Sequence, residues 1–178
     1  MIAGSAFVSE AAYVVGEVVM GEHSSVWPGA VLRGDTGYIR IGHNTHVEDN
    51  CTIHSGDVDI GDDVTIGHNA VIHCRSIGDG TLIGNSATLL DGVIIGRHCV
   101  VAAGAVVRAK TTVPDHSLAI GVPAIIRPLP ENLRIFTTYY NKPYAELAAR
   151  YKAEGLGSPE VEMSGTEAQP PIASPEQR

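Results

Sequence analysis

Three histidines of the chain stand at spacings that could build a metal site. The stretch VTIGHNAVIH, residues 64–73, carries His68 and His73 five residues apart, and His54 ends the stretch CTIH upstream. Imidazole nitrogen is a common zinc ligand, and an open catalytic zinc site commonly holds three protein ligands plus water. The spacing is also compatible with three separate histidines on an exposed surface that share no function. Which of these holds depends on the secondary-structure elements that carry them.

A six-residue period in the aliphatic residues predicts those elements. It favours a parallel β-helix, in which each hexad supplies a short strand and a corner and three hexads complete one coil. Ordinary strands of a β-sandwich would not keep one period over so many units. At three places near the histidines the spacing between successive periodic residues departs from six, and we expect corner loops there. The periodic positions are Val8, Val14, Met20, Val26, Leu32, Ile41, Val47, Ile53, Ile60, Ile66, Ile72, Ile77, Ile83, Leu89, Ile95, Val101, Val107, Val113 and Ala119.

Composition agrees with a layered core and limits the partners. Only 5% of the 178 residues are aromatic while 44% are hydrophobic, so the core must be packed from small aliphatic side chains. A formal net charge of -8 argues against nucleic acid or an anionic membrane as partner. We find no secretory signal or apolar run long enough to span a bilayer, and no CxxC motif. A cytoplasmic location is therefore predicted.

The period ends near GVPAIIRP and divides the chain into three parts. Residues 1–128 are predicted to form the β-helix. Residues 129–155 are predicted to be a helical segment packing on it, with Pro143 opening a helix and Gly155 ending it. Residues 156–178 are rich in Pro, Ser, Glu and Gln, and we expect a disordered tail.

Folding the period onto three faces groups some of the candidate residues. Arg33, His54 and His73 each follow a periodic residue on the same face of successive coils. Parallel strands stack about 4.7–4.9 Å apart, so these side chains should project outward in one column, where two imidazoles can share a metal ion. His68 belongs to another face, around a corner from His73.

His68 and His73 of one chain cannot easily bind the same ion, because side chains that point outward from adjacent faces of the coil diverge by roughly 120°. If three chains stand about a threefold axis, the His54–His73 column of one faces the His68 corner of the next, and three equivalent sites form. The same packing can bring Arg33 and Asp49 together as an ion pair between subunits.

Four motifs resemble the γ-class carbonic anhydrase family. They are WPGAVLRGD at 27–35, EDNCTIH at 48–54, IGHNAVIH at 66–73 and GVPA at 121–124. The resemblance spans residues 5–152. It implies a left-handed β-helix, a homotrimer, and a zinc ion, with iron or cobalt as alternatives, held by three histidines shared between subunits.

The resemblance also implies roles for particular residues. The metal ligands fall on His54, His68 and His73, and Arg33, Asp35 and Asp49 fall at interface and active-site positions. Tyr144, in YAEL, resembles a tyrosine of the C-terminal helix near the metal in some members. Glu48 stands where the family commonly has glutamine, and we expect it to orient or deprotonate the attacking water. The implied reaction is the reversible hydration of CO2 to bicarbonate.

Two other functions stay open at this stage. Hexapeptide-repeat proteins also include acyl-CoA-dependent transferases, which use one interfacial histidine as a base, and fold does not fix function. A catalytically silent trimer that binds metal or serves in an assembly is the third interpretation.

Overall fold

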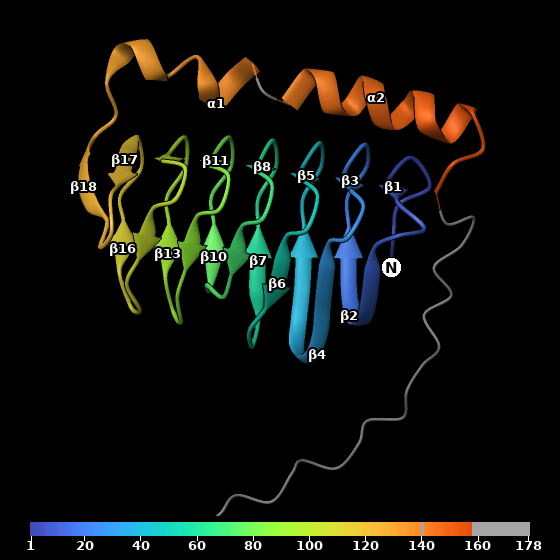
Figure 1. The fold of residues 1–178 in the computed structure, drawn as a ribbon, viewed down its shortest axis with the longest axis horizontal. Coiled ribbons are helices and arrows are strands. Elements are labelled where there is room, and N and C mark those ends of the chain that lie inside the picture. The colour runs from blue at the N-terminus through green and yellow to red at the C-terminus, as the bar shows by residue number, and fades with distance from the viewer. Residues whose placement is uncertain (140, 158–178) are drawn as a thin grey trace, which may run out of the picture.

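The chain forms a parallel β-solenoid with helices lying along one side (Figure 1). The structure is a computed structural model, and it describes residues 1–139 and 141–157. The predicted β-helix of hexapeptide repeats with a C-terminal helix is confirmed. From residue 158 onward, the predicted tail lies outside the described residues.

One face of the solenoid, the helix face, is an eight-stranded sheet. All neighbouring strands in it are parallel except the last pair, in which β18 runs antiparallel to β17. In spatial order its strands are β1 (Phe7–Val8), β3 (Ser25–Val26), β5 (His46–Val47), β8 (Thr65–Ile66), β11 (Leu82–Ile83), β14 (Val100–Val101), β17 (Ser117–Ile120) and β18 (Ile125–Pro128).

The other two faces share one sheet that bends around a corner at its longest strand, β4 (Val31–Ile41). The first half of β4 pairs with β6 (Thr52–His54) and belongs to the face that we call the β6 face. Its second half pairs with β7 (Val58–Ile60) and belongs to the β7 face. β2 (Tyr13–Met20) pairs with both halves. The β6 face continues with β6 (Thr52–His54), β9 (Val71–Ile72), β12 (Thr88–Leu89) and β15 (Val106–Val107). The β7 face continues with β7 (Val58–Ile60), β10 (Ser76–Ile77), β13 (Ile94–Ile95) and β16 (Thr112–Val113).

The periodic aliphatic residues fill the interior. All of them belong to one buried cluster except Val14, which is partly buried and packs against it. The residue four positions after many of the periodic residues is small and also buried, as at Ala70 and Ala87. Corner residues such as Asn50 and Asn69 have a positive φ, a conformation that asparagine tolerates better than most residues. Each hexad therefore buries one aliphatic side chain and turns a tight corner.

The first slip of the period does not interrupt the strand, contrary to the predicted loop. β4 continues through it, and its register against β2 shifts, so that Gly16 pairs with Gly34 but Glu17 pairs with Tyr38. The three extra residues are accommodated as a bulge at the corner, which is how an antiparallel or parallel ladder absorbs surplus residues. The bulge holds Thr36 against His54.

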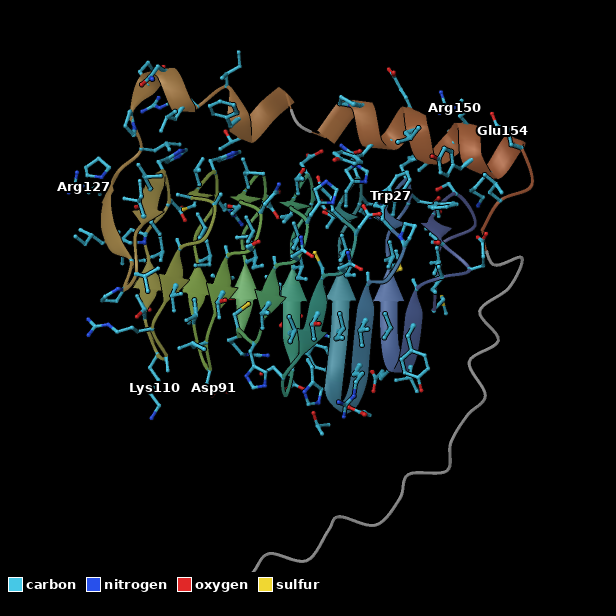
Figure 2. All side chains as sticks on the ribbon, viewed as in Figure 1. Trp27, Asp91, Lys110, Arg127, Arg150 and Glu154 are labelled. Atoms are coloured by element: carbon cyan, nitrogen blue, oxygen red, sulfur yellow. The ribbon has the colours of Figure 1, made fainter. Side chains whose placement is uncertain are left out.

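The C-terminal helices cover the helix face (Figure 1). They are η1 (Glu131–Leu133), α1 (Phe136–Tyr139) and α2 (Asn141–Ala153), and Gly155, with φ +78°, follows α2. α2 packs over β1, β3 and β5, where Ala148 lies in a buried cluster with Phe7 and Trp27. Figure 2 shows Trp27 beneath α2. Among the described residues, no helix is long and apolar enough to cross a membrane.

The three cysteines are buried free thiols in the core. Burial raises the pKa of the Cys51 and Cys74 thiols to about 12, and it also raises the pKa of Cys99. An unfolded thiol ionises near pH 8.5. Above that pH the unfolded chain therefore loses thiol protons that the folded chain keeps.

We expect the free energy of unfolding to fall as the pH rises from about 8.5 toward 12. Each buried thiol contributes at most about 1.4 kcal/mol per pH unit, because the unfolded state binds fewer protons there. Urea denaturation at pH 7.5 and 10 measures the change. The Cys51→Ala/Cys74→Ala variant is the control for other titrating groups. Equal slopes in the variant and the parent would contradict the assignment to these thiols.

Candidate metal centre

His54 and His73 lie side by side at the corner that follows the β6 face. Arg33 pairs with His54 in register, and Ile53 pairs with Ile72, so His73 occupies the next rung of the same column. The imidazole rings of His54 and His73 have centroids 5.8 Å apart and meet edge to face. Both side chains are partly exposed, at 27% and 37%. Two potential metal ligands thus lie together on the outer surface of the solenoid.

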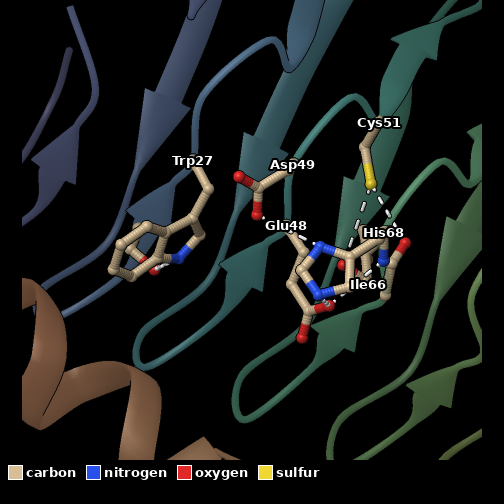
Figure 3. A network of polar contacts seen from close by, with 8 residues as sticks. Trp27, Glu48, Asp49, Cys51, Ile66 and His68 are labelled. Atoms are coloured by element: carbon tan, nitrogen blue, oxygen red, sulfur yellow. Dashed lines mark hydrogen bonds and ion pairs between the residues drawn. The ribbon is translucent and has the colours of Figure 1, made fainter. Parts of the chain in front are cut away.

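His68 lies at the opposite end of the same face, at the corner that precedes it. Its Nδ1 is 3.1 Å from Asp49 Oδ2, and its Nε2 is 3.0 Å from Glu48 Oε2 (Figure 3). In the described part of a single chain, no three His, Cys, Asp or Glu side chains come together as a group that could hold a metal ion. The two histidine corners of one chain are therefore separate sites of potential ligation.

Arg33 and Asp35 form an ion pair on the same column. Arg33 Nε donates to Asp35 Oδ2 over 3.1 Å, and Nη2 lies 3.0 Å from the same oxygen. Desolvation acts to raise the pKa of Asp35, but the hydrogen bond and charge of Arg33 outweigh it and hold the pKa below its ordinary value. Asp35 also lies 3.3 Å from His54 Nε2. The carboxylate is thus ionised beside a candidate ligand.

Glu48 is the buried carboxylate of this region. Its side chain is only 5% exposed, and Oε2 accepts a hydrogen bond of 3.1 Å from the backbone N–H of His68. Glu48 and His68 line one end of a groove of about 460 Å³ that runs between the helix face and the C-terminal helices. Aliphatic side chains such as Leu82 and Val100 form most of its wall.

Tyr144 of α2 lines the same groove as Glu48 and His68. Its ring centroid is 5.8 Å from those of Trp27 and His46. Because α2 packs over β3 and β5, it brings this tyrosine to Glu48 from a segment nearly a hundred residues away in the sequence. The structure thus places Tyr144 near two of the predicted site residues.

His46 is a site neighbour that sequence reasoning missed. It is fully buried, and its Nδ1 is 2.8 Å from Ser25 Oγ, which accepts a hydrogen bond of 2.8 Å from Trp27 Nε1. The alternating pattern places His46 on the outward side of β5, where solvent would be expected. The only available sequence signal is the apolar stripe of α2, which covers this part of the face.

Asp91 is a second contact that the sequence did not reveal. Its Oδ1 lies 2.7 Å from His73 Nδ1. Each of the three candidate ligands therefore has an aspartate partner: Asp35 for His54, Asp49 for His68 and Asp91 for His73.

The donor set fits a divalent transition metal ion. Three imidazoles suit zinc, iron or cobalt. Metal-binding histidines usually donate their second ring N–H to a carboxylate or carbonyl, and His68 and His73 each have an aspartate at Nδ1. An ion bound through Nε2 of His68 would compete with the contact of that atom with Glu48 Oε2. His54 meets Asp35 through Nε2, a contact that an ion would compete with.

Comparison with known proteins identifies the family. The family described as "Bacterial transferase hexapeptide (six repeats)" matches residues 76–109. "Gamma carbonic anhydrase 1, mitochondrial" of Arabidopsis thaliana is 43% identical over 84% of this chain, which spans 58% of that protein. "Probable carbonic anhydrase" of Methanocaldococcus jannaschii is 42% identical over 74% of this chain and 85% of its own length. The chain belongs to the γ-class carbonic anhydrase family.

The γ-class fold is shared with proteins that carry other names. A solved structure titled as a putative acetyltransferase from Bacillus cereus is 34% identical, with a TM-score of 0.78 over 86% of this chain and 91% of its own. Membership in the γ class, predicted from the motifs, is confirmed by the relatives, whereas the reaction must be argued from the site.

Proposed function

We propose that this protein is a metal-dependent carbonic anhydrase that interconverts CO2 and bicarbonate at three-histidine sites shared between the subunits of a homotrimer. The observation that supports this most directly is the placement of the ligands. His54 and His73 lie together at one end of the β6 face, and His68 lies at its other end.

The β6 face has the surface expected of a subunit contact. Of its two outward columns, the one that does not carry Arg33, His54 and His73 contains only uncharged side chains, and Val71 in the middle of it is 41% exposed. If this face turns toward a threefold axis, the His54–His73 corner of one subunit meets the His68 corner of the next, and the symmetry closes after three copies. The column consists of Tyr13, Val31, Thr52, Val71, Thr88 and Val106.

His54 and His73 of one subunit and His68 of its neighbour would hold the ion, which we expect to be zinc, with iron or cobalt also suited. When bound, such an ion lowers the pKa of its water to near neutrality and so supplies the nucleophile for CO2. Asp49 and Asp91 orient two of the imidazoles through Nδ1.

In this proposal Glu48 orients the attacking water and accepts its proton. Its carboxylate is 3.0 Å from His68 Nε2, within hydrogen-bond reach of the ligand edge, and it is shielded from bulk solvent. The largely aliphatic groove beside it suits an uncharged substrate better than a charged one. Tyr144 borders the groove, and Arg33 and Asp35 form the charged edge of the opposite corner.

Stopped-flow measurement of CO2 hydration, combined with metal analysis and native mass spectrometry, tests this function. We expect a trimer that carries about one ion per subunit and hydrates CO2. A metal-loaded trimer without CO2 hydration would favour the silent metal-binding protein. Release of thiol from acetyl-CoA in the presence of an acceptor would favour an acyl transferase, the activity for which the similar Bacillus cereus protein is named.

A further inference from the structure

We propose that Asp91 is a positioning residue that fixes the His73 ring with its hydrogen on Nδ1, so that the lone pair of Nε2 is available to the ion. This inference rests on the proposed function, because it concerns the same metal site. It adds a residue outside the motifs that carry the family resemblance.

The contact itself determines the tautomer. The distance from Asp91 Oδ1 to His73 Nδ1 is 2.7 Å, at the short end of N–H···O hydrogen bonds and typical of a charge-assisted one. An ionised carboxylate only accepts hydrogen bonds, so the hydrogen must lie on Nδ1. In the neutral ring, the lone pair then lies on Nε2, the atom left to bind a metal.

The backbone presents the Asp91 side chain from a rigid corner. Asp91 stands between Leu90 and Gly92, whose φ is +66°, and the N–H of Val93 donates to the Leu90 carbonyl over 3.2 Å to close the turn. The N–H of Lys110 in the next coil donates to the Asp91 carbonyl over 2.7 Å. Figure 2 shows Asp91 and Lys110 on neighbouring turns, at the edge away from the helices. A side chain on such a braced turn loses little further entropy when it holds an imidazole.

A second aspartate makes the same contact at the other histidine corner. Asp49 Oδ2 lies 3.1 Å from His68 Nδ1, so the ligand from the neighbouring subunit would also bind through Nε2, in place of that atom's contact with Glu48. The two corners are built from different faces of the solenoid, yet each pairs a histidine with an aspartate of an adjacent coil. This agreement favours a common role in orienting ligands.

A purely structural role for Asp91 is the competing explanation, because Asp followed by Gly is a common turn sequence. Asparagine supports such turns as well as aspartate does. Asp91→Asn therefore keeps the turn and removes the charge, while Asp91→Ala removes the acceptor altogether. Glu154→Ala is the matched control, since it deletes an equally negative, exposed carboxylate that directly follows α2, far along the chain from the histidines.

The first measurement is the tautomer of His73 in the metal-free trimer, from ¹⁵N NMR of the imidazoles at pH 8.5, where an ordinary imidazole is neutral. The His73 signals are assigned by their loss in His73→Gln. We expect Nδ1–H in the parent and in Glu154→Ala, and a shift toward Nε2–H in Asp91→Ala. An unchanged tautomer in Asp91→Ala would overturn the proposal.

The second measurement is zinc affinity by competition with a chromophoric chelator. We expect the dissociation constant to rise about 10- to 100-fold in Asp91→Ala, and less in Asp91→Asn, as is typical when a carboxylate partner of a metal ligand is lost. Unchanged affinity in both variants would overturn the proposal and leave the proposed function intact. A parent trimer whose zinc binding does not depend on the three histidines would instead overturn the proposed function, and the tautomer measurement alone would decide the role of Asp91.

Discussion

Replacing His54, His68 or His73 singly with alanine is expected to remove the bound metal and nearly all CO2 hydration. Each histidine supplies one of three nitrogens, and a site left with two holds an ion weakly. The loss should exceed the ~100-fold that carboxylate partners of ligands typically contribute. Metal content after dialysis and the stopped-flow rate constant measure the two losses.

His98→Ala is the matched control for these variants. His98 and His116 are also one coil apart, and their rings stack with centroids 5.2 Å apart, but they lie at a different corner from the candidate ligands. Removing one ring of that pair changes the surface to a similar extent, so metal and rate should stay at the parent level. If the three ligand variants kept the parent's metal content and rate, the three-histidine assignment would be wrong.

The solenoid could be predicted from the sequence because its core demands one aliphatic side chain per hexad. No other arrangement of short strands requires Ile53, Ile72 and Leu89 to coincide on one face, as they do in the strand pairing. The first slip was harder to interpret. Extra residues at a corner can form a loop or a bulge, and only the register against β2 shows that β4 continues through.

The candidate site was predictable only in part, for a physical reason. A repeating strand pattern indicates which way a side chain points, so it groups Arg33, His54 and His73, but it does not show what covers an outward residue. His46 is buried because α2 lies over it, a tertiary contact between distant segments. Asp91 reaches His73 from a corner position, where the alternation of strands no longer applies.

Trimers assembled from equal amounts of His68→Ala and His73→Ala chains are expected to regain about a quarter of the parent's sites, although each variant alone has none. A His68→Ala chain keeps an intact His54–His73 corner, and a His73→Ala chain keeps an intact His68 corner. About three in four random trimers contain both kinds of chain, and each of these has one interface of three where the intact corners meet. Metal content and CO2 hydration of co-refolded mixtures measure the recovery.

Mixing His54→Ala with His73→Ala chains is the decisive control, because both substitutions damage the same corner. Every interface of such a mixture contains one defective His54–His73 corner, so no arrangement of subunits rebuilds a complete site. Recovery in the first mixture and none in the second would mean that His68 acts on an ion together with the neighbour's His54 and His73. Equal recovery of metal and CO2 hydration in the two mixtures would contradict a shared site. If the ligands came from one chain, or if the histidines were unrelated to the metal, recovery would not depend on which corner of the partner is intact.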